Sequence, residues 1–335
     1  MKNYYITGAS GHLGRNIVLD ILNNEKEDFQ IIALILENEK YLDFNDLNKK
    51  ITFVTGNVLS IEDCLKFLST KKGDKNIVIH SAGLISIYKN KDPKVMNVNI
   101  NGTKNMLDAS LKNHIDKFIY ISSVDCIIKE KTGIVKEPSY FDENMVQGVY
   151  AKSKAIATNC VLSYNNLGLE TITIHPSALV GPNDYFKGPI NLALSKFYKG
   201  KLPAIVTGGY NIVDARDVAH GIVAAANSSY SNTSYIMSGT SISIKDLMNL
   251  SSKITSKPSY KICVPSTLVK IFSPFIELFY KIRKQKPLFT GYSMTCLHQN
   301  FNYTSEKAEK ELNYNSRNFE DTLKDTFKWI EDNKW

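Results

Sequence analysis

The sequence contains few arginines, since only Arg15, Arg216, Arg283 and Arg317 occur among its 335 residues. The net charge of +8 is therefore carried mainly by lysines, which are scattered along the chain. No basic stripe interleaved with aromatic residues is present, so nucleic acid is not expected as a partner. The charge is better explained as a solvated basic surface that attracts anionic ligands.

Cysteine pairs at short spacing are also missing. The five cysteines show no CxxC spacing and have no histidine partners at metal-binding spacing (Cys64, Cys126, Cys160, Cys263 and Cys296). This excludes a disulfide framework and predicts no metal site, and it fits a reducing, cytoplasmic compartment. A strand-like run begins at Tyr4, where a signal peptide would lie, so no signal peptide is expected.

A clean membrane span is absent as well. The most apolar stretch, Pro265–Pro287, is interrupted by Lys270, Pro274 and Glu277 and ends in a basic cluster. We therefore expect no stable span. Two interpretations remain open: an amphipathic helix that associates weakly with a membrane surface, or a helix that packs over an apolar substrate cleft. The second is favoured.

What the sequence does contain is a glycine turn near its start. Thr7–Gly14 reads TGASGHLG, follows the strand-like Tyr4–Ile6 and leads into the helical pattern of Arg15–Leu22. A strand, a glycine turn and a helix in this order form a cradle for a diphosphate, whose charge meets the free N–H groups of the first helical turn. The glycines are spaced three and three, unlike the two and three of the commoner dinucleotide motif.

Apolar strands alternate with helical patterns through the first two thirds of the chain. The predicted strands after the first are 31–36, 51–54, 77–80, 118–121 and 171–174, with helices near 61–68 and 95–113. This predicts an α/β fold with a doubly wound, mostly parallel sheet and a ligand crevice at the carboxyl ends of its strands. We expect a dinucleotide-binding domain at 1–180, with 210–228 returning to it. The segments 181–209 and 229–335 would form a smaller, mostly helical substrate-binding region.

The candidate catalytic residues follow the fifth strand and open the next helix. Tyr150 and Lys154 are four residues apart, so they share a helix face, and the ammonium is expected to lower the pKa of the phenol. A tyrosine tuned in this way can act as general acid or base in carbonyl–alcohol chemistry. Ser122 and Ser123 end the strand at 118–121, where a hydroxyl can hold the substrate oxygen beside Tyr150.

Together these motifs resemble the extended short-chain dehydrogenase/reductases over nearly the whole chain. Further matching segments are HSAG at 80–83, NINGT at 99–103, IYISS at 119–123, HPSALVGP at 175–182, VDARDVA at 213–219 and YTSEKA at 303–308. The resemblance implies a nicotinamide dinucleotide cofactor, with Ser123 as the catalytic serine, Tyr150 as proton donor and Lys154 on the nicotinamide ribose. The implied cofactor-binding residues are Gly8, Ser10, Gly11, His12, Leu13, Gly14, Glu37, Asn57, Val58, Ala82, Gly83, Asn99, Tyr150, Lys154, Pro176, Ser177 and Ala178. Asn57 occupies a place near the adenine that is usually Asp.

The choice of substrate branch depends on residues 175–182. Nucleotide-sugar enzymes of this group carry Arg, Asn and Tyr where this chain has His175, Ala178 and Val180. They also bind the diphosphate through arginines, which are scarce here, and lysine lacks the planar fork. The apolar 265–282 region and Phe289–Gly291 look more like the dihydroflavonol-reductase-like and hydroxysteroid-dehydrogenase-like branch. The implied reaction is hydride transfer to or from a carbonyl or alcohol of a mostly apolar small molecule.

The sequence leaves the form of the cofactor open between NAD and NADP. Glu37 follows the second strand, where a carboxylate would favour NAD. Arg15 and Lys40 could instead meet a 2′-phosphate, and the resembling branch mostly uses NADP, so NADP is slightly favoured.

Two other functions compete with hydride transfer to an apolar molecule. A nucleotide-sugar epimerase or dehydratase with bound NAD is the main alternative, and a non-catalytic nucleotide-sensing protein on the same fold is a lesser one. Family members often dimerise through helices like 95–113 and 151–162, so a homodimer is expected.

Overall fold

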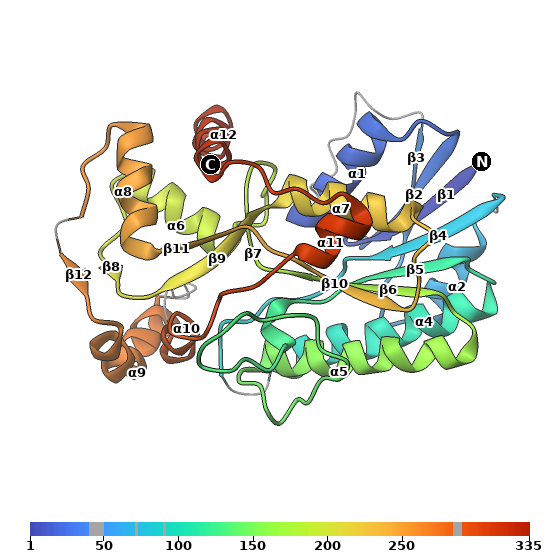
Figure 1. The fold of residues 1–335 in the computed structure, drawn as a ribbon, viewed down its shortest axis with the longest axis horizontal. Coiled ribbons are helices and arrows are strands. Elements are labelled where there is room, and N and C mark those ends of the chain that lie inside the picture. Colours follow the sequence, from blue (N-terminus) through green and yellow to red (C-terminus); the bar gives the residue numbers. More distant parts are fainter. Residues whose placement is uncertain (40–49, 71–72, 90–91, 261, 284–289) are drawn as a thin grey trace.

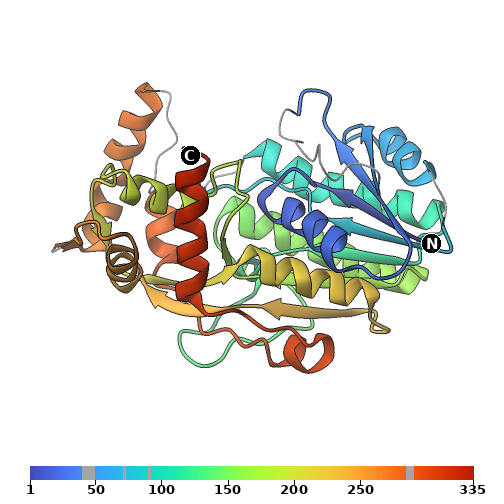
Figure 2. The ribbon, with the colours of Figure 1, turned by 90° about the horizontal axis from the view of Figure 1, so that it is seen from above.

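The computed structural model of the chain describes residues 1–335 apart from 40–49, 71–72, 90–91, 261 and 284–289; within the helix at 266–282, the side chains of 274 and 276–281 are also left undescribed. Lys40 and Phe289, which the sequence analysis singled out, therefore lie outside the described residues. The chain forms two lobes, with the N-terminus in one and the C-terminus in the other (Figures 1 and 2).

The larger lobe is built on a seven-stranded sheet in which every neighbouring pair is parallel. Its strands are β1 (Lys2–Thr7), β2 (Phe29–Ile35), β3 (Ile51–Thr55), β4 (Lys75–His80), β5 (Lys117–Ile121), β6 (Thr171–Pro176) and β10 (Thr233–Met237). They lie in the order β10-β6-β5-β4-β1-β2-β3, so the winding direction reverses between β1 and β4. A ligand crevice is expected at such a switch point, outside the carboxyl ends of the strands. The predicted doubly wound α/β fold is confirmed.

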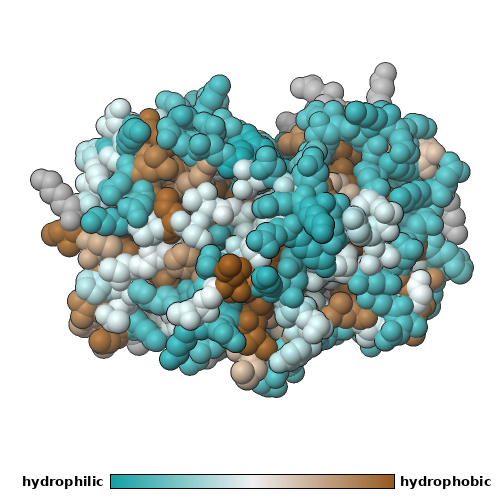
Figure 3. All heavy atoms as spheres, in the orientation of Figure 1, coloured by the Kyte–Doolittle hydropathy of each residue, from teal (hydrophilic) through white to brown (hydrophobic). Residues whose placement is uncertain are grey.

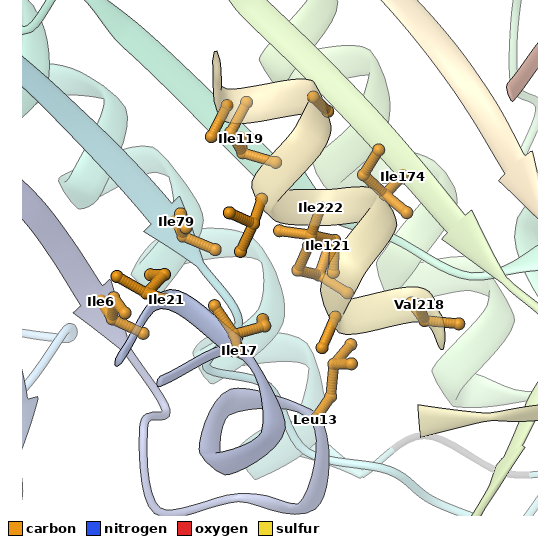
Figure 4. Close-up of a cluster of buried hydrophobic side chains, with 14 of the residues drawn as sticks. Ile6, Leu13, Ile17, Ile21, Ile79, Ile119, Ile121, Ile174, Val218 and Ile222 are labelled. Atoms are coloured by element: carbon orange, nitrogen blue, oxygen red, sulfur yellow. The ribbon is translucent and has the colours of Figure 1, made fainter. Parts of the chain in front are cut away.

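Helices cover both faces of this sheet (Figure 1). One face carries α1 (His12–Asn24), α7 (Ala215–Asn227) and α11 (Glu306–Leu312), and the other carries α2 (Ile61–Ser69), α4 (Thr103–Lys112) and α5 (Val149–Tyr164). Figure 4 shows the first of these interfaces, where branched side chains of α1 and α7 pack on the central strands. Because helices cover both faces, the central strands are apolar without alternation, as the sequence pattern predicted.

The helical stretch predicted at 95–113 is present but not uniform. It consists of α3 (Pro93–Met96), a π-helical segment η2 (Asn97–Gly102) and α4. The Asp92 side chain caps α3 by accepting hydrogen bonds from the backbone N–H groups of Lys94 and Val95. A π-helical segment inside a helix is uncommon and is frequent at functional sites. Here it carries the buried Asn99.

The smaller lobe, hereafter the small lobe, lies beyond the carboxyl ends of the main strands (Figure 1). It holds a three-stranded sheet of β7 (Ala178–Val180), β9 (Gly209–Asp214) and β11 (Thr240–Ser243), and a two-stranded sheet of β8 (Ile205–Val206) and β12 (Cys263–Val264). Its helices are α6 (Pro189–Tyr198), α8 (Ile244–Thr255), α9 (Ser266–Ile282), α10 (Gly291–Cys296) and α12 (Phe319–Asp332). Across the described ranges, no helix is both long and apolar enough to cross a bilayer.

Two strands near the lobe boundary lie where the sequence analysis did not place them. The segment before α7 was expected to return to the main sheet, but β9 pairs with β7 and β11 in the small lobe, and only α7 packs on the main sheet. The position beside β6 is taken instead by β10, from the segment assigned to the substrate-binding region. The division of the chain into two functional regions therefore stays a prediction. The two lobes exchange segments along the chain, because β9 belongs to the small lobe and β10 to the main sheet.

Ion pairs around the start of α7 join the two lobes. The buried Asp214 caps α7 and binds the Arg216 guanidinium through both oxygens, at 2.7 and 3.0 Å. Arg317, just before α12, pairs with Asp217 at 2.7 Å and reaches Asp214 at 3.5 Å. Arg216 also pairs with Asp325 of α12.

Candidate active site

The glycine turn forms a cradle that side chains would fill. Gly8 has a φ of +69°, and a Cβ on Gly14 would lie 2.0 Å from the carbonyl oxygen of Gly8. The backbone N–H of Gly11 donates to that same carbonyl at 3.0 Å, which closes the turn. Gly14 therefore permits the close packing of α1 against the strand end, as the sequence motif predicted.

The N-terminus of α1 points its free N–H groups at this turn. The N-cap residue is Gly11, no side chain caps the helix, and its first turn has no acidic residue. Such an end offers unsatisfied donors and a positive dipole to an anion. These features fit the diphosphate of a nicotinamide dinucleotide.

The adenosine side of the cradle shows one residue that the sequence analysis missed. Glu37 is exposed, whereas Glu39 bonds the Ser10 hydroxyl with one carboxylate oxygen and accepts a 2.9 Å hydrogen bond from the backbone N–H of Leu36 with the other. The acidic group at the end of β2 is thus Glu39. The sequence signal that could have identified Glu39 is an acidic residue four positions after the end of β2.

The other two residues proposed for the adenine side lie next to each other after β3. Asn57 is exposed, and its side chain accepts a 3.0 Å hydrogen bond from the backbone N–H of Leu59. Val58 is buried against Gly102. Asn57 therefore shapes the turn after β3.

A chain of hydrogen bonds joins the strand ends of β1 and β4. The Thr7 hydroxyl accepts from the N–H of Ala82 at 3.2 Å and lies 2.7 Å from Nδ1 of His80. On the far side of the ring, Nε2 of His80 lies 3.1 Å from the Thr103 hydroxyl, which donates to the carbonyl of Asn99. Burial lowers the pKa of His80 to about 3, so the ring is neutral and acts as a fixed spacer.

Asn99 fixes the loop after β4 and contacts the catalytic helix. Its amide forms two hydrogen bonds with the backbone of Leu84, at 2.8 and 3.0 Å, and donates to the Ser153 hydroxyl at 2.9 Å. Ser153 in turn donates to the backbone carbonyl of Tyr150. The side chain predicted to bind cofactor thus positions Gly83 and the first turn of α5.

The two serines after β5 are separated by the structure. The Ser122 hydroxyl lies 2.7 Å from that of Thr158 on α5, inside the protein. The Ser123 side chain instead lies near the Tyr150 phenol, whose pKa it lowers, and accepts a hydrogen bond from the N–H of Asp125 at 3.1 Å. Of the two candidates, Ser123 is the one that faces Tyr150.

The expected lowering of the Tyr150 pKa by Lys154 is wrong. Burial raises the Tyr150 pKa well above its ordinary value, the Asp125 carboxylate adds to this, and the Ser123 hydroxyl opposes it only in part. The physical reason is the direction of the lysine. Its ammonium donates to the carbonyl of Ile121 at 2.7 Å and lies over the Tyr120 ring, 4.9 Å from the centroid.

Lys154 is itself strongly perturbed. Its side chain is buried, and this burial lowers its pKa to about 8. A Cβ on Gly83 would lie 3.3 Å from the ammonium nitrogen, so the lysine reaches the loop that follows β4. Burial of a lysine beside a crevice is a frequent mark of a functional site.

His175 packs against the backbone of Ser123, a role that the sequence analysis did not predict. Nδ1 of His175 lies 3.3 Å from the Ser123 carbonyl, and the ring stacks on Phe141. Burial lowers the His175 pKa to about 4, which leaves the ring neutral. Among the described residues, Nε2 of His175 and the buried Ser177 hydroxyl have no hydrogen-bond partner. Pro176 ends β6, and Ala178 begins β7 in the small lobe.

The small lobe closes one side of the site through α10. A Cβ on Gly148 would lie 2.2 Å from the Tyr292 ring, and the Tyr292 hydroxyl donates to the Gln147 carbonyl at 2.5 Å. Thr290 donates to the carbonyl of Ile87, in the loop after β4. Gly148 is the N-cap of α5, so the small lobe touches the helix end that carries Tyr150.

The fold and this site define a dinucleotide-binding enzyme, and comparisons with known proteins give its family. A family model described as the 3-beta hydroxysteroid dehydrogenase/isomerase family matches residues 5–248, so the chain belongs to that family. Its relatives include a putative dihydroflavonol 4-reductase of Synechocystis, which is 26% identical over 334 residues covering 98% of this chain and 94% of the relative. Another is a decarboxylating sterol-4-alpha-carboxylate 3-dehydrogenase of Schizosaccharomyces pombe, 24% identical over 347 residues covering 99% and 98% of the two chains.

Solved structures show the same fold over the whole chain. The protein gox2253 superposes with a TM-score of 0.79 and 24% identity, covering 98% of each chain. A UDP-glucuronic acid 4-epimerase from Bacillus cereus, solved with UDP-glucuronic acid and NAD, gives a TM-score of 0.76 at 19% identity and covers 99% of each chain. The chain is thus an NAD(P)-dependent enzyme of the extended short-chain dehydrogenase/reductase type, acting by hydride transfer on a small molecule.

Proposed function

We propose that this enzyme interconverts a carbonyl and an alcohol on a mostly apolar small molecule, with Ser123, Tyr150 and Lys154 as its catalytic residues. The observation that carries this proposal is that Ser123, after β5, and Tyr150, in the first turn of α5, lie close enough for the serine hydroxyl to lower the phenol pKa, beside the buried Lys154. When bound, the nicotinamide cofactor supplies or accepts the hydride.

In this proposal Tyr150 exchanges the proton and Ser123 holds the substrate oxygen. Burial keeps the phenol protonated at neutral pH, which suits a general acid that donates its proton as the carbonyl oxygen gains charge. The Ser123 hydroxyl, held by the N–H of Asp125, would donate a second hydrogen bond to that oxygen. The Lys154 ammonium would meet the nicotinamide ribose hydroxyls.

The substrate side favours an apolar molecule over a nucleotide sugar. Two of the four arginines, Arg216 and Arg317, are held by buried aspartates at the lobe boundary, and Arg15 packs on Tyr185 at 4.7 Å. A phenol lies at the small-lobe side of the site instead, since the Tyr292 ring contacts Gly148 at the start of α5. Burial raises the pKa of Tyr210, Tyr292 and Tyr303, and the Asp125 carboxylate adds to each shift.

For the cofactor, the position of Glu39 favours NAD, whereas the sequence analysis slightly favoured NADP. The Glu39 carboxylate contacts Ser10 in the glycine turn, where it can accept hydrogen bonds from ribose hydroxyls and would repel a 2′-phosphate. We further propose a homodimer formed through α4 and α5, and a reducing compartment, which the five free cysteines support. Light scattering of the purified protein tests the dimer.

The test of the proposed function is Tyr150→Phe, assayed by NADH and NADPH turnover across a panel of apolar ketones and alcohols. We expect loss of turnover by roughly 10²–10⁴-fold, the usual contribution of a general acid, with cofactor affinity retained. Tyr140→Phe, at an exposed position, is the matched control and should leave turnover unchanged. Full turnover by Tyr150→Phe would refute the proton-donor role. Tightly bound NAD together with a rise in melting temperature on adding a UDP- or GDP-sugar would favour the epimerase alternative.

A further inference from the structure

The backbone carbonyl of Ser123 is held by a buried cluster of hydrogen bonds whose members take no part in the proposed proton transfer. Ser123 is the N-cap of a short 3₁₀ helix, η3 (Val124–Cys126), and its carbonyl accepts from the Cys126 thiol at 2.9 Å and from the backbone N–H of Cys126 at 3.3 Å. Nδ1 of His175 lies 3.3 Å from the same oxygen. The Cys126 and His175 side chains are 0% exposed, beneath a large-lobe surface that is mostly hydrophilic in the view of Figure 3.

The Ser123 carbonyl fixes which nitrogen of His175 carries the proton. A carbonyl oxygen only accepts hydrogen bonds, so Nδ1 must donate and Nε2 must be the bare acceptor. Among the described residues, Nε2 has no hydrogen-bond partner. The opposite tautomer would bury an unpaired N–H and turn a nitrogen lone pair towards the Ser123 oxygen, and both changes cost free energy. His175 is thus a neutral donor aimed at the backbone of Ser123.

The same cluster reaches the backbone of α5. The Cys126 sulfur lies 3.3 Å from the Ser122 hydroxyl, which lies 2.7 Å from the Thr158 hydroxyl. Thr158 in turn donates to the backbone carbonyl of Lys154 at 2.7 Å. The loop that carries Ser123 is therefore joined to the catalytic helix at Lys154. Ser122, which does not face the site, is one of the links in this connection.

The His175 ring is itself fixed by its neighbours. It stacks on Phe141 with ring centroids 5.2 Å apart and an interplanar angle of 25°. The Phe141 carbonyl accepts a 2.6 Å hydrogen bond from the side-chain amide of Asn159 on α5. The donor that faces the Ser123 carbonyl is thus held by packing that also connects to α5. Such support matters, because misplacement of a reacting group by about an ångström can lower a rate by about 10²-fold.

We propose that His175 and Cys126 are positioning residues that act through the Ser123 carbonyl and keep the Ser123 hydroxyl directed at the substrate oxygen. This rests on the proposed function, because it assumes that Ser123 holds that oxygen. It also gives a role to a position where this chain differs from the nucleotide-sugar enzymes, which carry Arg in place of His175. A buried neutral imidazole donates to a carbonyl without the desolvation cost of a buried guanidinium.

The test compares three substitutions of His175 by their kcat, their KM for the cofactor and their melting temperature. His175→Phe retains the stacking on Phe141 but removes the donor, so kcat should fall by roughly 10–100-fold while KM and melting temperature hold. His175→Asn loses the stacking but places its amide nitrogen where Nδ1 lies, so kcat should recover to within a few-fold of the unaltered enzyme at a lower melting temperature. His175→Gln, the matched control, carries the same amide one bond further along the side chain and should not restore kcat.

Cys126 is tested in the same way. Cys126→Ala removes the thiol donor but leaves the backbone N–H on the Ser123 carbonyl, so kcat should fall less than in His175→Phe. Cys126→Ser restores a side-chain donor and should recover kcat. Nitrogen NMR of the labelled enzyme provides a readout that does not depend on turnover. It should show a proton on Nδ1 of His175 and none on Nε2 at neutral pH, with the signal identified by its loss in His175→Phe.

Three outcomes would contradict the positioning role. A proton on Nε2, or a kcat that follows the melting temperature with His175→Phe above His175→Asn, would overturn it. Full turnover by His175→Phe in an enzyme that Tyr150→Phe inactivates would overturn it while leaving the proposed function intact. No turnover by the unaltered enzyme across the panel of ketones and alcohols would refute both.

Discussion

The two lobes present the ligand with different kinds of surface. At the cofactor edge of the large lobe, the backbone shapes the site: Gly8, Gly11 and Gly14 form a tight turn before the uncapped start of α1, and polar side chains such as Asn99 are tied to neighbouring backbone. The small lobe instead presents the Tyr292 ring to the start of α5 and exposed apolar side chains of α9 to the outside. We therefore expect the large lobe to bind the cofactor mainly through backbone groups and the small lobe to select the substrate.

The largest effect should come from closing the cradle. Gly14→Val places a Cβ where the Gly8 carbonyl oxygen lies 2.0 Å away, so α1 must move off the strand end. We expect NADH binding, measured by fluorescence titration, to be abolished. Gly133→Ala is the control: its φ of +96° makes alanine strained, but no atom lies within 4 Å. It should cost about 1 kcal/mol of stability and leave binding intact. NADH binding by Gly14→Val would show that the cradle is less rigid than the fold implies.

Lys154 should separate activity from stability. Lys154→Met removes a buried ammonium, so turnover should fall by orders of magnitude while the melting temperature holds or rises. Lys152→Met, two residues away and only partly buried, should change neither.

The pH dependence of the unaltered enzyme follows from the Lys154 pKa of about 8. The folded state holds the lysine proton less tightly than the unfolded state, so this group costs stability below pH 8 and the cost is relieved between pH 8 and the unfolded pKa of about 10.4. As the pH rises through this range, stability should increase but cofactor affinity should fall, because the Lys154 ammonium loses its proton. If cofactor affinity did not change between pH 7 and 9, the Lys154 ammonium would not be the charge that binds the cofactor.

Asp214 should contribute strongly to stability at the boundary between the lobes. Asp214→Asn leaves Arg216 and Arg317 without their shared buried partner and should cost about 2–4 kcal/mol in denaturant unfolding. Asp325→Asn, at a half-exposed site, should cost less than about 1 kcal/mol. The arginines hold the Asp214 pKa below its usual range. Its stabilising contribution is therefore present above the unfolded pKa of about 3.9 and is lost as the pH falls through the folded value.

The smallest effect sharpens the cofactor choice. Glu39→Gln should shift the ratio of NADP to NAD affinity towards NADP by about tenfold, because the charge facing a 2′-phosphate is removed. Glu37→Gln, an exposed position, should leave the ratio unchanged. The opposite pattern would restore Glu37 as the selecting residue.

The large lobe could be predicted from sequence because its rules are local. Apolar strands that alternate with helical patterns predict a parallel sheet. The spacing of the glycines predicts the turn before α1, and the positions of Ser123, Tyr150 and Lys154 predict which strand end and helix carry them. Long-range pairing could not be predicted in the same way. The edge position beside β6 went to β10 rather than to β9, and no local pattern distinguishes those two short strands.

Side-chain directions were the second limit of the sequence analysis. Helical spacing places Lys154 on the same face as Tyr150, but the ammonium bonds the Ile121 carbonyl, so the expected effect on the phenol pKa does not occur. Similarly, Glu39 rather than Glu37 bonds Ser10, because the chain turns after β2. These outcomes depend on tertiary contacts that residue types do not encode.

The contact between Tyr292 and Gly148 couples the small lobe to the start of α5. Because the ring occupies the space where any other residue would carry its Cβ, the small lobe forms a wall of the active site. A shift of this lobe by about an ångström would remove a contact at the N-terminus of the helix that holds Tyr150. The position of the small lobe and the start of the helix that holds Tyr150 are therefore tied to each other.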